Sequence, residues 1–313
     1  MPSSNSVDYT VSANEIIADA LANIGEVAAG ETVSSEDSAF CLGKLQRLVK
    51  QWQGTADYAP GLKMWSRKRA YLFLQQGQGS YSLGPSGDHA TAAYYETTLD
   101  GNEAAGQTIL SVTATANMTT ADYIGVVLDS GAMHWSTISS FVAGDTVTIA
   151  DALPSSAASG NAIYWYTTKM RRPVDIITAV IRNSAGHDSP LTPLIVQQYE
   201  AIGDKAGVGR PDSYYYESQL TNGVLYLNIT PSDVTDVVRL VFHSPIEDFD
   251  ALTDTADVPQ QWYRPLGYQL SLDIAPAYGR VVSQELMMLR NESLAIARNA
   301  DPETTSIYFE PGR

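Results

Sequence analysis

Residues 89–168 contain no lysine and no arginine, although acidic residues occur throughout this stretch. Short runs rich in Val, Ile, Thr, Tyr and Trp follow one another in it, separated by Gly, Asp and Ser. Basic residues return at once on both sides, in KMWSRKR before the stretch and in KMRR after it. Strand-sized runs without a helical period are typical of a small β-barrel or β-sandwich. We therefore predict that residues 89–169 form an inserted β-rich domain.

The N-terminal region shows helical periodicity instead. Ser12 precedes Glu15 by three positions, which is the spacing of a capping box, and apolar residues then follow at helical spacing. A second apolar stripe over residues 45–52 follows a serine cap at Ser34 or Ser35. Because only a short loop separates the two patterns, they predict an antiparallel helical hairpin.

Strand and turn patterns dominate the segments on either side of the insert. Glycines within residues 71–85 predict a β-hairpin, and the Asn-Gly pair at 222–223 predicts a second hairpin over residues 214–229. A strand over 172–182, a short helix within 193–205 and a partner strand over 237–245 complete this part of the chain.

Residues 269–280, QLSLDIAPAYGR, are apolar on nearly every helical face and carry Pro276 in the middle. A proline inside a helix removes a backbone hydrogen bond and bends the axis. The segment is therefore either a kinked core helix of a monomer or a helix packed between two surfaces at different angles. A last helix follows over residues 282–297, and residues 301–313 are too polar and too rich in proline for a packed helix, so we expect an extended tail.

The charge balance excludes several classes of partner. Lys and Arg number 19 against 35 Asp and Glu, so the net charge is −16, which repels phosphate backbones and anionic membranes. We expect no sequence-specific DNA binding. Neither a secretory leader nor an apolar run long enough to span a bilayer is found, so we expect a soluble protein made in the cytoplasm.

No motif for catalysis, cofactor binding or metal binding is found. The four histidines are never four positions apart, as a zinc-binding helix requires, and GQGSYS lacks the third glycine of a dinucleotide-binding loop. The acidic run at 247–257 lacks the glycine and the terminal Glu of a calcium loop. Cys41 lies in an apolar helical stretch, so we predict a buried, inert thiol. We expect no cofactor, no metal and no enzyme activity.

The order of several segments resembles one protein family. These are the helical hairpin from ALANIGEV to LVKQW, then GQGSYSLGPSGD, RRPVDIITAV, GRPDSYYYE, NGVLYLNITP and PQQWYRPLGYQLSLDIAPAYG. Together, over residues 12–88 and 170–310, they resemble the head-to-tail adaptors of tailed phages, also called packaged-DNA stabilisation proteins or tail accessory factors of short-tailed phages. No single segment is diagnostic, and the insert departs from the shorter members of the family.

The resemblance implies an α+β fold with a helical-bundle adaptor core and flanking β-hairpins, from which a small β-barrel or β-sandwich domain is inserted. The core would comprise residues 1–88 and 170–300, the insert residues 89–169, and the extended C-terminal tail residues 301–313. Twelve copies would form a ring beneath the portal protein, joining the DNA-filled capsid to the tail and helping to retain the packaged DNA. The expected location is the neck or tail of the virion, after assembly in the host cytoplasm.

The resemblance also implies partners and contact residues. The expected partners are the portal protein, a tail nozzle or other tail proteins, further copies of the chain, and double-stranded DNA that passes through without sequence-specific contact. The residues expected to pack subunits together are Trp262, Leu266, Leu270, Ile274, Pro276 and Tyr278. Those expected to dock onto the portal are Ile307, Tyr308 and Phe309. Pro265 is unusual for this family, so we expect the helix to begin after it.

Two other functions stay open at this level. The many carboxylates permit a virion-associated glycan hydrolase. Aromatic residues of the insert could instead stack on sugars in a carbohydrate-binding appendage; they are Tyr123, Trp135, Tyr164, Trp165 and Tyr166. The basic stretches at 63–69 and 171–172 either pair with acidic partners or simply balance a solvated surface.

Overall fold

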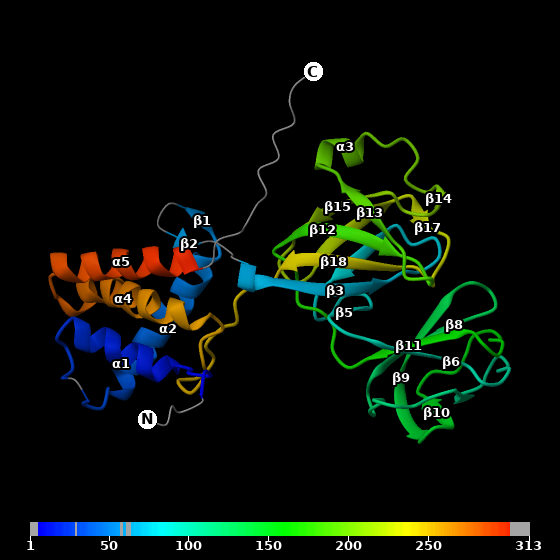
Figure 1. The fold of residues 1–313 in the computed structure, drawn as a ribbon, viewed down its shortest axis with the longest axis horizontal. Helices are drawn as coiled ribbons and strands as arrows, with labels where there is room; N and C mark the ends of the chain where they lie inside the picture. The colour runs from blue at the N-terminus through cyan, green and yellow to red at the C-terminus, as the bar shows by residue number, and fades with distance from the viewer. Residues whose placement is uncertain (1–5, 29, 57–58, 61–63, 301–313) are drawn as a thin grey trace. The chain divides into compact units, whose positions relative to one another are not determined.

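The computed structural model describes residues 6–28, 30–56, 59–60 and 64–300, and its contacts divide the chain into two units (Figure 1). The helical unit consists of residues 1–66 together with 246–313. The β unit consists of residues 67–245. The chain therefore passes from the helical unit into the β unit after Ser66 and returns to the helical unit after Pro245.

Four helices form the helical unit. They are α1 (Ala13–Asn23), α2 (Ser35–Trp52), α4 (Tyr263–Ile274) and α5 (Gln284–Ala300), with 3-10 turns η1 (Met64–Ser66), η2 (Gln260–Trp262) and η3 (Ala275–Tyr278) and a short strand pair, β1 (Thr55–Ala56) and β2 (Ala59–Pro60). The capping box of α1 is present, because the Glu15 backbone N–H donates to Ser12 Oγ and the Ser12 N–H donates to Glu15 Oε2. Ser34 caps α2 by accepting the Asp37 N–H.

Helix α4 contacts three helices of its own chain, α1, α2 and α5, which cover its apolar side chains, whereas Arg264 and Asp273 on the same helix are exposed. Trp262, which ends η2, and Leu266, Leu270 and Ile274 on α4 are each 0% exposed in one core with residues of α1, α2 and α5. This segment is therefore a core helix of its own chain. No interior kink is needed, because α4 ends at Ile274 and exposed Pro276 lies in the following turn η3.

The expectation that α4 begins after Pro265 is wrong. The helix begins at Tyr263, directly after η2, and Pro265 is its third residue. The first backbone N–H groups of a helix have no partner within the helix, so a proline in the first turn removes no helical hydrogen bond. Pro265 is buried there.

An eight-stranded sheet forms the larger part of the β unit, in the order β4-β16-β15-β13-β12-β18-β3-β5. Its strands are β3 (Arg67–Phe73), β4 (Ser80–Leu83), β5 (Ala90–Thr91), β12 (Asp175–Arg182), β13 (Asp188–Pro193), β15 (Ser213–Glu217), β16 (Gly223–Asn228) and β18 (Val237–His243). Neighbours are antiparallel except for β13 and β15. Helix α3 (Val196–Glu200) and strand β14 (Val208–Gly209) connect β13 to β15, and β14 pairs with β17 (Thr230–Pro231).

The hairpin predicted over residues 71–85 is wrong. Strand β3 pairs with β18 and β5, whereas β4 pairs with β16 at the other end of the sheet order. The predicted hairpin of β15 and β16 is present, but its Asn-Gly pair ends the loop and does not form a two-residue turn. Gly223 is required at this point because a Cβ there would lie 1.9 Å from the hydroxyl oxygen of Tyr216.

The residues predicted as an insert form a six-stranded sheet with the order β6-β11-β8-β9-β10-β7. Its strands are β6 (Tyr95–Thr98), β7 (Ile109–Ser111), β8 (Tyr123–Val127), β9 (Met133–Val142), β10 (Thr146–Ile149) and β11 (Ala162–Tyr166). An antiparallel bridge between Leu99 and Val112 joins the chain just beyond β6 to the chain just beyond β7. The two edges of the sheet therefore meet around an apolar core that includes Leu110, Ile124 and Ile163.

The predicted fold class, a helical-bundle core with flanking β-hairpins, is wrong, because the protein is mostly β. The segments 67–88 and 170–245 do not flank the helices but combine into the eight-stranded sheet, which has its own core. Pairs such as Phe73 with Val237 create this sheet across long sequence separations, which local periodicity does not reveal. The two units meet in the sequence at Ser66/Arg67 and at Pro245/Ile246.

We predict that Leu270→Ala lowers the free energy of unfolding by about 2–5 kcal/mol, because the smaller side chain leaves a cavity at a fully buried position. Urea unfolding followed by circular dichroism measures the change. Leu220→Ala is the matched control, since Leu220 is 98% exposed, and it should change stability by less than about 0.5 kcal/mol. Equal effects of the two substitutions would contradict the core position of Leu270.

Candidate functional site

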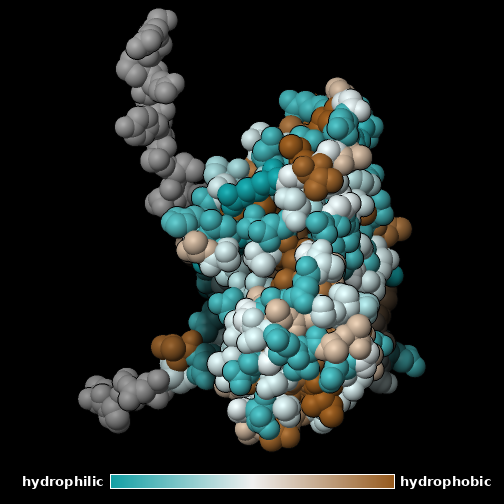
Figure 2. Space-filling model, turned by 90° about the vertical axis from the view of Figure 1, so that its right-hand side faces the viewer, coloured by the Kyte–Doolittle hydropathy of each residue, from teal (hydrophilic) through white to brown (hydrophobic). Residues whose placement is uncertain are grey.

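On α5 and the segment before it, four large apolar side chains are exposed, among polar residues such as Glu285, Asn291 and Glu292. Val281 is 95% exposed, Met288 65% and Ile296 58%, and Met287 is also exposed. Leu286, Leu294 and Ala297 hold the opposite side of the helix in the core. On the face drawn in Figure 2, exposed hydrophobic residues lie in small groups among hydrophilic ones. Isolated exposed apolar residues are ordinary, but several on one segment are typical of an interaction surface.

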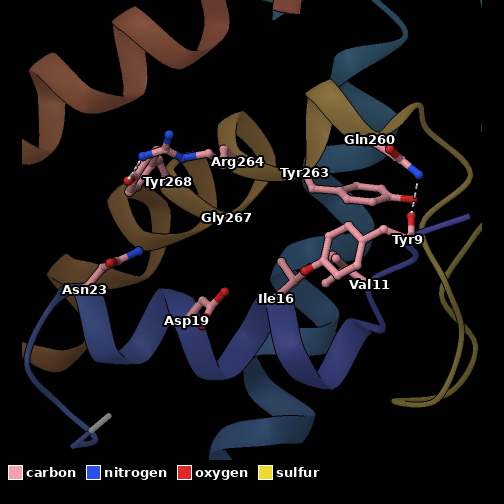
Figure 3. Close-up of a pocket in the computed structure, with 10 residues that line it drawn as sticks. All are labelled: Tyr9, Val11, Ile16, Asp19, Asn23, Gln260, Tyr263, Arg264, Gly267 and Tyr268. Atoms are coloured by element: carbon pink, nitrogen blue, oxygen red, sulfur yellow. Dashed lines mark hydrogen bonds between the residues drawn. The ribbon is translucent and has the colours of Figure 1, made fainter. Parts of the chain in front are cut away.

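A groove of about 380 Å³ lies between α1 and α4 in the helical unit (Figure 3). Val11 and Ile16 provide apolar surface, and Gly267 on α4 leaves its floor open, because a Cβ there would meet no heavy atom within 4 Å. Arg264 and Tyr268 lie along α4, where the guanidinium donates a hydrogen bond of 3.1 Å to the tyrosine oxygen.

The N-terminal segment builds one end of this groove. The Gln260 side-chain amide donates to the backbone oxygens of Val7 and Tyr9, at 3.0 and 2.9 Å. The Tyr9 ring packs edge-on against that of Tyr263, with ring centroids 6.1 Å apart. Burial, and to a lesser degree the neighbouring Tyr9, raises the pKa of Tyr263. Asp19 lines the α1 side, and among the described residues no hydrogen bond or ion pair to its carboxylate is formed.

The residues predicted to pack subunits together lie at different depths. Trp262, Leu266, Leu270 and Ile274 are buried within the chain, so they present no surface to a second copy. Pro276 is exposed. The residues predicted to dock onto the portal, Ile307, Tyr308 and Phe309, lie outside the described residues, as does the whole predicted tail.

Tyr278 is partly buried and ties the turn after α4 to α2. Its hydroxyl donates a hydrogen bond of 2.7 Å to Asp37. Burial, and to a lesser degree this hydrogen bond, raises the pKa of Tyr278. The same hydroxyl lies 3.8 Å from the sulfur of Cys41, which is buried, as predicted. Burial raises the pKa of the Cys41 thiol, so the inert state is favoured.

The aromatic residues predicted to stack on sugars are occupied by contacts within the β unit. Trp165 is buried inside the six-stranded barrel, whereas Tyr164 and Tyr166 are buried where that barrel meets the larger sheet. The Trp135 ring packs within the β unit, since the His89 ring stacks on it with ring centroids 3.8 Å apart and Gly125 lies so close that a Cβ there would be 2.8 Å from it. Stacking on a sugar needs a free aromatic face. Tyr164, Trp165 and Tyr166 offer none because they are buried, and the ring of Trp135 is already stacked on that of His89.

The remaining member of that set, Tyr123, is partly buried. It stacks on Tyr166 with ring centroids 5.2 Å apart, and the Lys169 ammonium lies 5.1 Å from its ring centre. Lys169 in turn donates a hydrogen bond to the backbone oxygen of Gly87. Tyr123 thus belongs to the same junction inside the β unit.

Phe73, at the end of β3, is the centre of this junction. It is 1% exposed, and the rings of Tyr94, Trp135 and Tyr164 lie 5.1–5.2 Å from it. Two residues further on, the Gln75 side chain pairs with the backbone of Met133, donating to its oxygen at 3.0 Å and accepting from its N–H at 3.4 Å. These contacts join the eight-stranded sheet to the barrel, and sequence reasoning missed them because Phe73 lies within an ordinary strand pattern.

His89 lies beside this junction, between β4 and β5. Its Nδ1 lies 2.7 Å from the Tyr166 hydroxyl oxygen, and its ring stacks parallel to that of Trp135. Burial, and to a lesser degree the nearby Lys169 ammonium, lowers the pKa of His89 to about 3. The imidazole is therefore neutral at physiological pH.

Buried carboxylates have structural partners. Glu103 accepts the Ser111 backbone N–H at 2.8 Å, and Asp122 accepts that of Thr119 at 2.8 Å. Asp236 faces Arg210 at 3.3 Å, and burial raises its pKa. Among the described residues, no group of three or more His, Cys, Asp and Glu side chains could hold a metal ion. None of the helices in the described part of the chain is long and apolar enough to cross a membrane.

Comparison with known proteins gives little. No protein-family model and no curated protein matches the chain. Among solved structures, VP17, a capsid protein of bacteriophage P23-77, is 11% identical with a TM-score of 0.12, over 60% of this chain and 76% of that one. A similarity this weak carries no argument about fold or function.

We predict that His89 makes the protein less stable in acid. The unfolded chain binds a proton near pH 6.5 but the folded chain only near pH 3, so the stabilisation is complete above about pH 6.5 and is lost as the pH falls towards about 3. In urea unfolding at several pH values, His89→Gln should remove on the order of 5 kcal/mol of this pH dependence. The control His187→Gln, in an exposed turn, should leave it unchanged, and an unchanged slope in the His89 variant would contradict the assignment.

Proposed function

We propose that this protein is a structural subunit of a phage head-to-tail connector. In this function, copies of the chain form a ring beneath the portal protein, joining the DNA-filled capsid to the tail and helping to retain the packaged DNA. The ordered set of segments that resembles the head-to-tail adaptors supports this function, although the helical unit is not the bundle core expected of it.

The observation that carries the proposal is the set of four exposed apolar side chains on α5 and the segment before it. Val281, Met288 and Ile296 lie exposed on the last segment of the helical unit, whereas the core positions of α5 are filled by its own chain. Contact between copies would remove these side chains from water, and each buried CH₂ group contributes about 0.8 kcal/mol. Subunit packing in the ring is therefore assigned to α5, because the predicted positions on α4 are buried within the subunit.

Net charge fits a passage for DNA. With −16 per chain, a ring of copies has a strongly negative potential, which opposes binding of the phosphate backbone. DNA could then slide through the ring without being held by the wall. The same charge makes the copies repel one another, so the apolar contact has to exceed this repulsion.

We predict that Met288→Asp prevents ring formation, because a carboxylate would be desolvated in the contact between copies. The purified chain is mixed with the portal protein of the virus that encodes it, and negative-stain electron microscopy counts particles with two stacked rings. Leu220→Asp is the control, since it adds the same charge at an exposed position of the β unit, and it should assemble as the wild type does. Stacked rings in the Met288 variant would contradict a contact through α5.

We also predict that salt promotes the association. Screening shortens the range of repulsion between acidic copies from about 30 Å at 0.01 M salt to about 10 Å at 0.1 M, while apolar contacts persist. Mass photometry of the chain across this range should show the oligomer fraction rising with salt. A fraction that falls with salt would mean that ion pairs, and not α5, hold the copies together.

A further inference from the structure

We propose that the groove between α1 and α4 is the binding site for residues 306–313 of the same chain, SIYFEPGR. The groove is open, because Gly267 contributes no side chain to its floor and a Cβ there would meet nothing within 4 Å. Its walls combine apolar and aromatic surface from Ile16, Tyr263 and Tyr268. The segment supplies three consecutive large apolar residues, Ile307, Tyr308 and Phe309.

Charges in the groove and in the segment are complementary. The α1 wall carries the carboxylate of Asp19 and the α4 helix the guanidinium of Arg264, so the groove offers one charge of each sign. The segment carries Glu310 and, three positions later, Arg313. Arg313 would pair with Asp19, which has no partner among the described residues, and Glu310 would pair with Arg264.

A short stretch of chain links α5 to the segment. Helix α5 ends at Ala300 and contacts η2, and Gln260 of η2 lines the groove. Residues 301–305 can span up to about 17 Å, at about 3.4 Å for each extended residue. A tether this short gives an effective concentration on the order of millimolar, so at micromolar protein the chain's own segment is favoured over that of a second copy.

Occupation of the groove has a physical consequence for the free protein. Three adjacent large apolar residues outside the core are prone to pair with other chains, and a groove within the same unit removes them from that risk. The inference is independent of the connector function, because it concerns a contact within one chain and needs no portal and no ring.

A fluorescence-anisotropy experiment on full-length chains tests the proposal, with a fluorescein-labelled peptide of residues 306–313 as the probe. The double variant Tyr308→Ser, Phe309→Ser disables the chain's own segment, so its open groove should bind the probe. The wild type should bind at least about tenfold more weakly, because its own segment competes at the tethered concentration. Circular dichroism confirms that each variant is folded.

Two further substitutions in the open variant locate the site. Gly267→Leu should fill the floor and reduce affinity at least about tenfold. Asp19→Arg should weaken binding about threefold to tenfold, and a probe carrying Arg313→Asp should restore it, as expected for a swapped charge pair. Asp145→Arg, the same charge change in the β unit, should have no effect.

Three results would overturn the proposal. The open variant could fail to bind the probe, or the wild type could bind it as tightly as the open variant does. Asp19→Arg and Gly267→Leu could both leave the affinity unchanged, which would place the segment elsewhere, on a partner such as the portal or on another surface. Each result is independent of whether stacked rings form with the portal.

Discussion

The packing around Phe73 is the contact on which the arrangement of the β unit depends. One phenyl ring at the end of β3 contacts Tyr94 from the chain before the barrel, Trp135 from β9 and Tyr164 from β11. Aromatic pairs at these distances add roughly 0.5–1.5 kcal/mol each beyond their buried area. The side-chain amide of Gln75 forms hydrogen bonds with both the backbone N–H and the backbone oxygen of Met133. Because hydrogen bonds require a defined geometry, these two restrict how the eight-stranded sheet packs against the barrel. The end of a single strand thus contributes a central part of the contact between the eight-stranded sheet and the barrel, next to the contacts of His89 with Trp135 and Tyr166.

Helix α4 is the packing centre of the helical unit, as Phe73 is that of the β unit. Its apolar faces are used by α1, α2 and α5, so a helix that could have served contact between copies is instead the centre of its own subunit. The surface available to partners is then formed by the outer elements, the exposed side of α5 and the groove beside α1. These surfaces differ in kind, since α5 presents exposed apolar side chains, whereas the groove combines apolar floor, tyrosine rings and one charge of each sign. The first suits a large partner surface and the second suits an extended peptide.

Local patterns predicted single elements well and their partners poorly. The capping box of Ser12 and Glu15 and the apolar stripe of α2 predicted helices that the structure contains, because those signals act within a few residues. The hairpin expected over residues 71–85 failed because β3 and β4 both have better partners far along the chain, β18 and β16. The candidate groove was not predicted either, since Asp19 and Arg264 line one groove only once α1 and α4 pack together. The aromatic residues of the insert suggested a sugar site, and their positions as packing residues depend on Phe73, which lies outside the insert.

The sequence by itself determined the charge of the protein, the helical segments near both ends and the strand-rich segments between them, because composition, caps and periodicity are local properties. Only the tertiary structure decided that the β segments before and after the insert form one sheet, that α4 is enclosed by its own subunit, and that Gly267 leaves a groove open. Each of these depends on which distant surfaces become neighbours. The apolar area buried and the backbone hydrogen bonds completed across the whole chain determine which surfaces pack together. Both depend on residues far apart in the sequence, so a short stretch of sequence does not reveal them.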